Sequence, residues 1–314
     1  MLFSAKYTFV VAIVLTLVSS SLLVVADSSS LSSDSLKRKT AIQSVGVFPL
    51  PSRLEFAGEA VPLEDAEIRE RLEREIIQNA YKHSATILIL KREKRWRQLI
   101  TRILKEQDVP EDFFYLAVAE SELDEYAQSP VGALGFWQFI RNTANKYGLE
   151  VSDQVDMRRD PIASTYAACR YFKEAYRKFS NWTLVAASYN RGIAGIENAL
   201  KAQKVSSFYD LYLNRETYRY VMRILALKLI MENPSEYGFN ISESDKYPPY
   251  LTKQVQIDTT INDLPQFALE RGITYKILKI YNPWLNSSDY RLVVPKGKSY
   301  TISLPVDVKE PEAR

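Results

Sequence analysis

The chain has 314 residues, which is enough for one large domain or two modest ones. Apolar residues make up 46% of it and charged residues 25%, proportions that are ordinary for a soluble globular protein. The formal net charge is +3 and no stretch is densely basic, so the sequence excludes a partner, nucleic acid above all, that is selected by bulk electrostatics.

The first 26 residues have the pattern of a targeting segment. Lys6 is the only charge before a long apolar run, and Ala26 ends a small-residue stretch typical of a signal cleavage site. Because the apolar run is long for a signal peptide, an N-terminal anchor is the alternative, and it predicts membrane association through this segment. In either case we expect the rest of the chain to be exported. Residues 27–62 begin with a serine-rich stretch and are expected to form a flexible leader.

Apolar residues recur at helical spacing from residue 63 to residue 235 and predict an all-helical domain over 63–235. Pro110 and Pro161 stand where a proline opens a helix, beside acidic residues that favour a helix N-terminus. The expected helices cover residues 63–79, 84–106, 111–121, 136–147, 162–179, 183–190, 196–202 and 215–231. Strand-like alternation is absent from this part of the sequence, so the predicted fold class is mainly α.

The composition changes after residue 235. A proline- and tyrosine-rich stretch within residues 236–250 predicts a linker. Residues 251–314 then combine helical and β-rich patterns, which predict a small α+β module of the order strand, helix, helix, strand. The expected helices are 264–271 and 275–281, and the β-rich runs are 255–257, 290–294 and 299–304. A module of this size is better suited to binding than to catalysis.

Cysteine and histidine are nearly absent from the sequence. Cys169 is the only cysteine, so an intrachain disulfide is excluded, and its helical setting predicts a buried side chain. His83 is the only histidine and stands in no recognisable motif, so we expect it at the surface. Together they supply too few ligands for a transition-metal site, and we expect neither a metal nor a cofactor.

Glu120 is the strongest candidate for a catalytic group. It follows the apolar run 113–119 in the last turn of a predicted helix, so burial is expected to raise its pKa, as a general acid at neutral pH requires. A helix cap or an ion pair with an arginine is the alternative, but the helix dipole disfavours a glutamate at this end. Glu122, Asp124 and Glu125 lie in a polar turn and are expected to be solvated. With no second buried acid in the pattern, one carboxyl group is expected both to give and to take a proton.

A glycine-rich turn follows this helix. Gly132 and Gly135 allow the backbone to approach a ligand closely, and they bring Gln138 and Phe139 forward. A glutamine can hydrogen-bond an acetamido or hydroxyl group. The alternative is a plain helix N-terminus with an aromatic anchor.

The third candidate is the pair Tyr189 and Asn190, which ends an alanine-rich helix. A helix C-cap with Gly192 just past the end explains Asn190 and Gly192 well. It does not explain Tyr189, which is therefore a candidate for a binding site.

Five blocks in this order carry a resemblance to a known family; they are 120–121, 129–139, 158–161, 187–192 and 216–221. The combination resembles the lytic transglycosylases with a lysozyme-like, soluble-lytic-transglycosylase catalytic domain, most closely the membrane-bound murein transglycosylase D type. The resemblance covers about residues 100–235. It implies a lysozyme-like helical domain that acts on peptidoglycan in the periplasm or cell envelope.

The resemblance also implies a mechanism. Glu120 would protonate the oxygen between N-acetylmuramic acid and N-acetylglucosamine, and then take the proton of the muramyl C6 hydroxyl, which closes a 1,6-anhydro ring without consuming water. Ser121 would orient Glu120. The substrate-binding residues carried over by position are Ser121, Gln138, Phe139, Tyr189, Asn190 and Tyr218.

The C-terminal module looks like a degenerate LysM-type domain, with the stretches 281–285 and 294–297 in its pattern. That resemblance implies binding to N-acetylglucosamine polymers, and a purely structural role is the alternative. Two rival functions stay open for the whole chain. One is a hydrolase of the goose-lysozyme kind, and the other is a non-catalytic wall-binding protein with a worn-out cleft.

Overall fold

The structure is a computed structural model that describes residues 46–286 and 288–306. The predicted targeting segment and the first part of the predicted leader lie outside the described residues. Within the part that is described, no helix is both long enough and apolar enough to cross a membrane.

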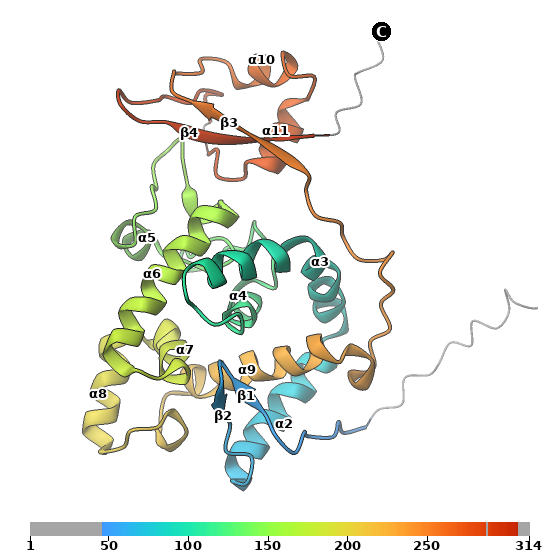
Figure 1. Cartoon of the computed structure of the whole chain (residues 1–314), viewed down its shortest axis with the longest axis vertical. Coiled ribbons are helices and arrows are strands. Elements are labelled where there is room, and N and C mark those ends of the chain that lie inside the picture. The colour runs from blue at the N-terminus through green and yellow to red at the C-terminus, as the bar shows by residue number, and fades with distance from the viewer. Residues whose placement is uncertain (1–45, 287, 307–314) are drawn as a thin grey trace, which may run out of the picture. The chain divides into compact units, whose positions relative to one another are not determined.

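The predicted helical class of residues 63–235 is confirmed (Figure 1). The α-helices of this region are α2 (Ala66–Ala80), α3 (His83–Glu106), α4 (Phe113–Ser121), α5 (Arg141–Lys146), α6 (Pro161–Phe179), α7 (Trp182–Arg191), α8 (Ile193–Gln203) and α9 (Arg215–Glu232). Short 3-10 turns lie at Met157–Arg159, Phe208–Asp210 and Pro234–Tyr237. Most helices begin within three residues of the predicted position.

Side-chain caps explain where several helices begin. The carboxylate of Asp160 accepts hydrogen bonds from the Ile162 and Ala163 amides, at 2.9 Å and 2.7 Å, and so starts α6. Asn181 and Asn214 accept from backbone amides in the first turns of α7 and α9 in the same way. A cap satisfies donors that a helix N-terminus otherwise leaves without partners.

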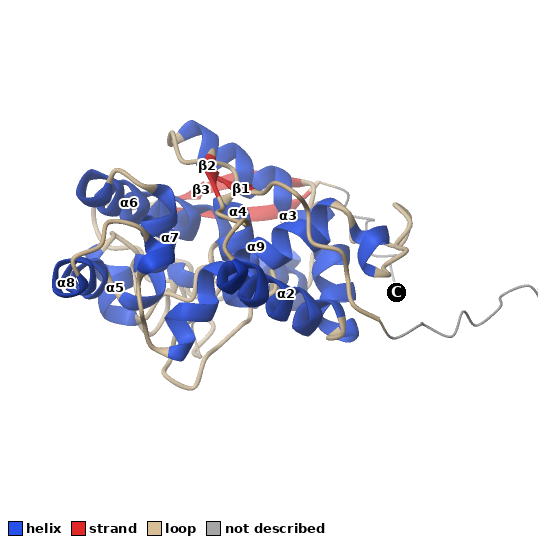
Figure 2. Ribbon diagram, turned by 90° about the horizontal axis from the view of Figure 1, so that it is seen from below, coloured by secondary structure: helices blue, strands red, loops and turns tan. Residues whose placement is uncertain are grey.

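Helix α4 is the central element of the helical domain. Its residues from Phe113 to Val118 are buried on every side, as expected for a short helix that is apolar all round. It packs against α3 and α9, while α2 packs against α9 as well. Figure 2 shows this group of helices from below. The packing brings the end of α4 beside the first half of α9.

Two expectations for the chain before and after α4 need correction. The predicted helix over 136–147 is shortened to α5, because Gln138 has a φ of 47° that no α-helix accommodates. Residues 128–139 instead form a looped turn with isolated bridges. The end of the leader predicted over 27–62 is packed, since Phe56 is fully buried and its ring lies 5.4 Å from that of Phe113. The surrounding residues form a hairpin of β1 (Glu55–Phe56) and β2 (Glu59–Ala60).

The C-terminal module has the predicted order of strand, helix, helix, strand. Strand β3 (Thr252–Ile257) pairs antiparallel with β4 (Tyr300–Pro305), and α10 (Leu264–Leu269) and α11 (Tyr275–Tyr281) lie between them in sequence. The β-rich run 290–294 is not a strand. It makes one isolated bridge, Ile261 to Leu292, and the Leu292 side chain is buried in the module's own core.

The helical domain and the module are joined by a loop as well as by the chain. Val155, from the loop before α6, is buried within the hydrophobic core of the module. The amide of Asp156 donates to the Trp284 carbonyl at 2.8 Å, and the amide of Asn286 donates to the Gln154 carbonyl at the same distance. The described residues from Val47 onward accordingly fall in one compact unit.

Candidate active site

Glu120 lies in the last turn of α4 with its carboxyl group only partly exposed. The phenol of Tyr220, on α9, donates a hydrogen bond to Glu120 Oε1. Burial raises the pKa of Glu120 to about 7, against the lowering effects of the Tyr220 hydrogen bond and of the Arg223 charge; nearby Glu216 adds to the rise. At neutral pH this carboxyl group therefore exists in both its protonated and its ionised form.

The local sequence explains why the carboxyl group stands where it does. Helix α4 is apolar and buried up to Val118, and Glu122 ends it in the left-handed region at φ 53°. Leu123 turns back into the core directly afterwards. Glu120 is thus held between a buried helix and a buried leucine, and its backbone has little freedom to move.

Tyr189, at the end of α7, lies in the electrostatic field of Glu120. Burial and the charge of Glu120 raise the pKa of Tyr189 well above its usual value, and the pKa of Tyr220 is raised for the same reasons. Both phenols are therefore neutral hydrogen-bond donors at neutral pH. The Tyr189 hydroxyl donates to the Trp137 carbonyl at 2.7 Å, and the Trp137 indole donates to Thr165 at 3.0 Å.

Gln138 is held by the glycine-rich turn. Its amide nitrogen donates to the Ala127 carbonyl at 3.1 Å and to the Gly135 carbonyl at 2.8 Å. A side-chain amide has two N–H donors, and both are used here. In any hydrogen bond with Gln138, a ligand therefore has to donate to its Oε1 atom.

A buried ion pair fixes the same turn. Arg158 bonds both carboxylate oxygens of Asp156, at 2.8 Å and 2.7 Å, and both side chains are almost fully buried. Arg158 also donates to the carbonyls of Gly132 and Phe139, at 2.9 Å and 3.2 Å. The turn thus depends on a charge pair whose acidic member is anchored in the loop that enters the C-terminal module.

Three of the predicted substrate-binding residues have structural roles in this arrangement. The Ser121 hydroxyl donates its only proton to the Ala117 carbonyl at 3.0 Å, so it does not donate to Glu120. The Phe139 ring is buried and lies 6.1 Å from the Tyr189 ring, so it positions that tyrosine. Asn190 accepts from the Thr217 hydroxyl at 2.7 Å, which joins the end of α7 to the start of α9.

Tyr220, which was not among the predicted site residues, meets Glu120, whereas the predicted substrate-binding residue Tyr218 points elsewhere. The Tyr218 ring stacks beneath the guanidinium of Arg71, 3.5 Å from its centroid, and the Tyr218 carbonyl accepts from Arg71 at 2.7 Å. Side chains two positions apart in a helix point to nearly opposite faces, so only one of the two tyrosines can face α4. The signal in the sequence was the spacing of Tyr220 with Ile224 and Leu227, which marks the buried face of α9.

The other acidic residues near Glu120 differ in environment. Glu216 is exposed and pairs with Arg223 at 3.3 Å, and it is the acidic neighbour whose charge acts on Glu120. The expectation that Glu125 is solvated is wrong, because it is half-buried and burial raises its pKa. Asp124 pairs with Arg92 at 3.1 Å.

The cysteine and the histidine have no catalytic arrangement around them. Cys169 is buried in α6, and burial raises the pKa of its thiol to about 12, so it remains protonated. His83 is less exposed than predicted: it is half-buried, and its ring lies 6.0 Å from that of Tyr81. Over residues 46–286 and 288–306, no cluster of three or more metal-ligating side chains is found.

Comparison with known families adds to this geometry. Residues 98–211 match the family described as transglycosylase SLT domain. The chain carries a transglycosylase SLT domain. The match includes Glu120, Gln138, Tyr189 and Asn190, and it stops before α9, which supplies Tyr220. Residues 253–308 match a second family, the soluble lytic transglycosylase C-terminal LysM-like domain.

Two curated proteins are similar to this chain. Both are named membrane-bound lytic murein transglycosylase D, one from Escherichia coli strain K12 and one from Escherichia coli O6:H1 strain CFT073. Each is 30% identical over 230 residues, which cover 72% of this chain and 49% of the relative. The chain therefore spans about half the length of the curated relatives it matches.

Two solved structures are similar over part of the chain. An inactive mutant of the lytic transglycosylase Slt from Pseudomonas aeruginosa is 20% identical with a TM-score of 0.36, over 48% of this chain and 26% of that one. The 70 kDa soluble lytic transglycosylase from Escherichia coli is 17% identical with a TM-score of 0.38, over 62% and 34% of the two chains.

Proposed function

We propose that the protein is a lytic transglycosylase that cleaves the glycan strands of peptidoglycan in the cell envelope or periplasm, with Glu120 as the catalytic acid and base. The observation that carries the proposal is the Glu120 carboxyl group, which is partly buried, hydrogen-bonded by Tyr220 and has a pKa of about 7. The SLT domain and the LysM-like module agree with peptidoglycan as the substrate.

One carboxyl group is enough for both proton transfers. Protonated Glu120 gives its proton to the glycosidic oxygen between N-acetylmuramic acid and N-acetylglucosamine as that bond breaks. The ionised carboxylate then takes the proton of the muramyl C6 hydroxyl while the C6 oxygen bonds to C1. The products are a free N-acetylglucosamine hydroxyl and a 1,6-anhydromuramic end, and no water is consumed.

The surrounding residues have separate parts in this proposal. Tyr220 holds the carboxyl group and stabilises it when it is ionised. Gln138 presents Oε1 to a substrate N–H or O–H group, and Tyr189 lines the site near the cleaved bond. Asn190 and Phe139 keep Tyr189 in place, and Tyr218 remains a predicted substrate contact in the same cleft.

Hydrolysis is the second candidate, and Glu216 is the observation that favours it. Its carboxylate is exposed and lies close enough to Glu120 for its charge to raise that group's pKa. A second carboxylate is what a hydrolase needs to activate water. Against this, the Glu216 carboxylate is paired with Arg223 at 3.3 Å, and this ion pair makes it a weaker base for activating water.

The deciding experiment digests purified peptidoglycan with the full-length chain and measures the masses of the released muropeptides. Transglycosylation predicts 1,6-anhydromuramic ends, which are lighter than reducing ends by one water. Glu120→Gln should lower the rate about 100-fold to 10,000-fold, the range that a general acid typically contributes. Glu216→Gln is the matched control and should keep most of the activity.

Three results would count against the proposal. Reducing muramic ends, together with a large loss in Glu216→Gln, would establish the hydrolase. No release by the wild-type chain, together with retained binding to the wall, would establish the non-catalytic protein. Normal release by Glu120→Gln would remove Glu120 from the mechanism.

A further inference from the structure

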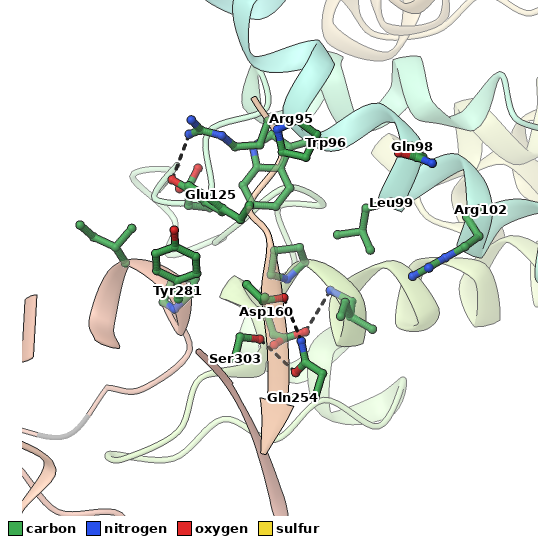
Figure 3. Close-up of a pocket in the computed structure, with 17 residues that line it drawn as sticks. Arg95, Trp96, Gln98, Leu99, Arg102, Glu125, Asp160, Gln254, Tyr281 and Ser303 are labelled. Carbon is green, nitrogen blue, oxygen red and sulfur yellow. Dashed lines mark hydrogen bonds between the residues drawn. The ribbon is translucent and has the colours of Figure 1, made fainter. Parts of the chain in front are cut away.

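A cavity of about 300 Å³ lies where the helical domain meets the C-terminal module (Figure 3). Its walls come from α3, from the turn after α4, from the start of α6, and from the linker, β3, β4 and α11. Neither Glu120 nor Gln138 nor Tyr189 is among its lining residues. The cavity is thus separate from the site described above, and its volume is at the lower end of the range for small-molecule sites.

The cavity is preformed, because the parts that surround it are held together. Arg95 donates to the Pro248 carbonyl at 3.0 Å and to the Tyr250 hydroxyl at 2.9 Å, which fixes the linker against α3. The rings of Trp96, Tyr250 and Tyr281 contact one another in that order, with centroids 5.6 Å and 4.8 Å apart. The loop contacts at Val155 hold the module from the other side.

The lining combines apolar surface with polar groups. Trp96, Leu99, Pro249 and Tyr281 supply apolar and aromatic faces. In Figure 3, Gln254 and Ser303 lie together on one wall, where the Ser303 hydroxyl donates to Gln254 Oε1 at 3.1 Å. Side-chain amides and hydroxyls beside an aromatic ring suit a ligand that has both C–H faces and hydrogen-bonding groups.

The charges that line the cavity balance. Arg95 and Arg102 carry two positive charges, and Glu125 and Asp160 carry two negative charges when ionised. Figure 3 shows Arg102 and Glu125 on opposite sides. A balanced lining gives no electrostatic preference for an anionic or a cationic ligand. It favours a neutral ligand that is recognised by stacking and hydrogen bonds.

We propose that this cavity binds a neutral N-acetylated amino-sugar segment of a glycan strand, as a second subsite built jointly by the helical domain and the module. The sugar stacks on Tyr281, and its hydroxyl and acetamido groups bond Gln254 and Ser303. The ligand class rests on the proposed function. The cavity adds a hold on the strand away from the bond that is cut.

Binding is tested with the full-length Glu120→Gln chain and the β-1,4-linked tetrasaccharide of N-acetylglucosamine, by calorimetric titration. Tyr281→Ala and Gln254→Ala should each remove one binding site or weaken it about tenfold, which corresponds to about 1.4 kcal/mol. Tyr281→Phe keeps the ring and should bind as the parent does.

The strand itself supplies a matched control. Gln256 lies two residues along β3 from Gln254, and it bonds Thr301 across the strand pair as Gln254 bonds Ser303. It does not line the cavity. Gln256→Ala should therefore leave the titration unchanged. Equal titrations in the parent, Tyr281→Ala and Gln254→Ala, with melting temperatures that show all three folded, would overturn the proposal.

A stem tetrapeptide of peptidoglycan is titrated in parallel. Heat from the peptide that Tyr281→Ala abolishes, with none from the sugar, would assign the cavity to peptide and overturn the sugar assignment. No binding of either probe at millimolar concentration would overturn the site itself.

Turnover separates this proposal from the proposed function. These variants are also made in the active chain, which keeps Glu120. There, Gln254→Ala and Tyr281→Ala should raise the half-saturating concentration of long glycan strands about fivefold to tenfold, with the maximal rate within about twofold of wild type. Anhydro products with unchanged kinetics in both variants would leave the function standing and reject the cavity. A titration that depends on Tyr281 in a chain that releases nothing would do the reverse.

Discussion

Effects of opposite sign act on the pKa of the Glu120 carboxyl group. Burial disfavours its ionised form, while the Tyr220 hydrogen bond and the Arg223 charge favour it. Burial is the largest of these effects, and the balance leaves the pKa at about 7. A pKa near the working pH lets one group act as an acid in the first step and as a base in the second. The proton transfers therefore depend on Tyr220 as well as on Glu120.

The pH dependence of activity follows from this balance. The acid must start protonated, so kcat/KM should fall about tenfold per pH unit above pH 7. Tyr220→Phe removes a hydrogen bond that lowers the pKa, so it should move this alkaline limb to higher pH and slow the reaction. Initial rates between pH 5 and pH 9 measure both. Tyr218→Phe is the matched control on the other face of α9, and an equal shift in that variant would contradict the assignment of Tyr220.

The same pKa also affects stability. Its value in the folded protein, about 7, is above the ordinary 4.5, so folding favours the protonated form. The contribution is fully present below pH 4.5 and is lost as the pH rises through 7. Relative to Glu120→Gln, the wild type should lose about 3 kcal/mol of unfolding free energy between pH 4.5 and pH 8. Urea denaturation of the two chains at both pH values checks this, and parallel curves would show that the pKa is not raised.

At the scale of elements, the turn over 128–139 matters most, because it carries Gln138. Three devices hold it: positive φ values, the two bonds of the Gln138 amide, and the buried Arg158 side chain. The carbonyl of Arg158 also passes so close to Gly135 that a Cβ there would lie 2.0 Å from it. The element is therefore a rigid loop packed on the start of α6, as the predicted glycine-rich turn implied, and it also includes residues 136–139, where a helix was expected.

Two glycines of this turn provide a matched pair of variants. Gly132→Ala and Gly135→Ala both place a side chain at a positive φ, but only Gly135→Ala adds a backbone clash. Gly132→Ala should cost about 1 kcal/mol of stability, and Gly135→Ala about 3 kcal/mol or more. Gly135→Ala should also raise KM or lower kcat through Gln138. Thermal unfolding and the peptidoglycan assay measure both, and equal costs would show that the loop yields around the clash.

At the scale of the whole molecule, the module is attached by more than its linker. Val155 of the helical domain is buried in the module's core. Asp156 beside it donates its backbone amide to the Trp284 carbonyl, and its carboxylate accepts from Arg158. A path of direct contacts therefore runs from the module to the turn that carries Gln138. The module has a structural role in the site whether or not it also binds glycan.

This attachment predicts a single cooperative unfolding transition for the two parts. Calorimetry should give one peak with equal calorimetric and van't Hoff enthalpies. Val155→Asp places a charge in the module's core and should split the peak into two. The exposed neighbour Asp153→Asn is the control and should change nothing. Two separate peaks in the wild-type chain would show that the contacts at Val155 do not couple the parts.

Helix positions could be predicted well because periodicity and caps are local. The helices that start at Pro161 and after Asn181 and Asn214 begin within a residue or so of the predicted points, since each start depends on one side chain and the next few amides. Glu120 could be predicted for a similar reason, because seven apolar residues before it already imply burial. The helix expected over 136–147 begins only at Arg141, because the conformation of the residues before it depends on Arg158, about twenty positions away.

The sequence by itself determined the helical class, the candidate acid and the order of elements in the module, because these follow from spacing along one stretch of chain. Tertiary structure alone decided which tyrosine meets Glu120, that the Ser121 hydroxyl bonds the Ala117 carbonyl, that Glu125 is half-buried, and that a cavity forms beside Tyr281. Each of these depends on which faces of distant helices pack together. That choice comes from the burial of many side chains at once, and no single segment contains it.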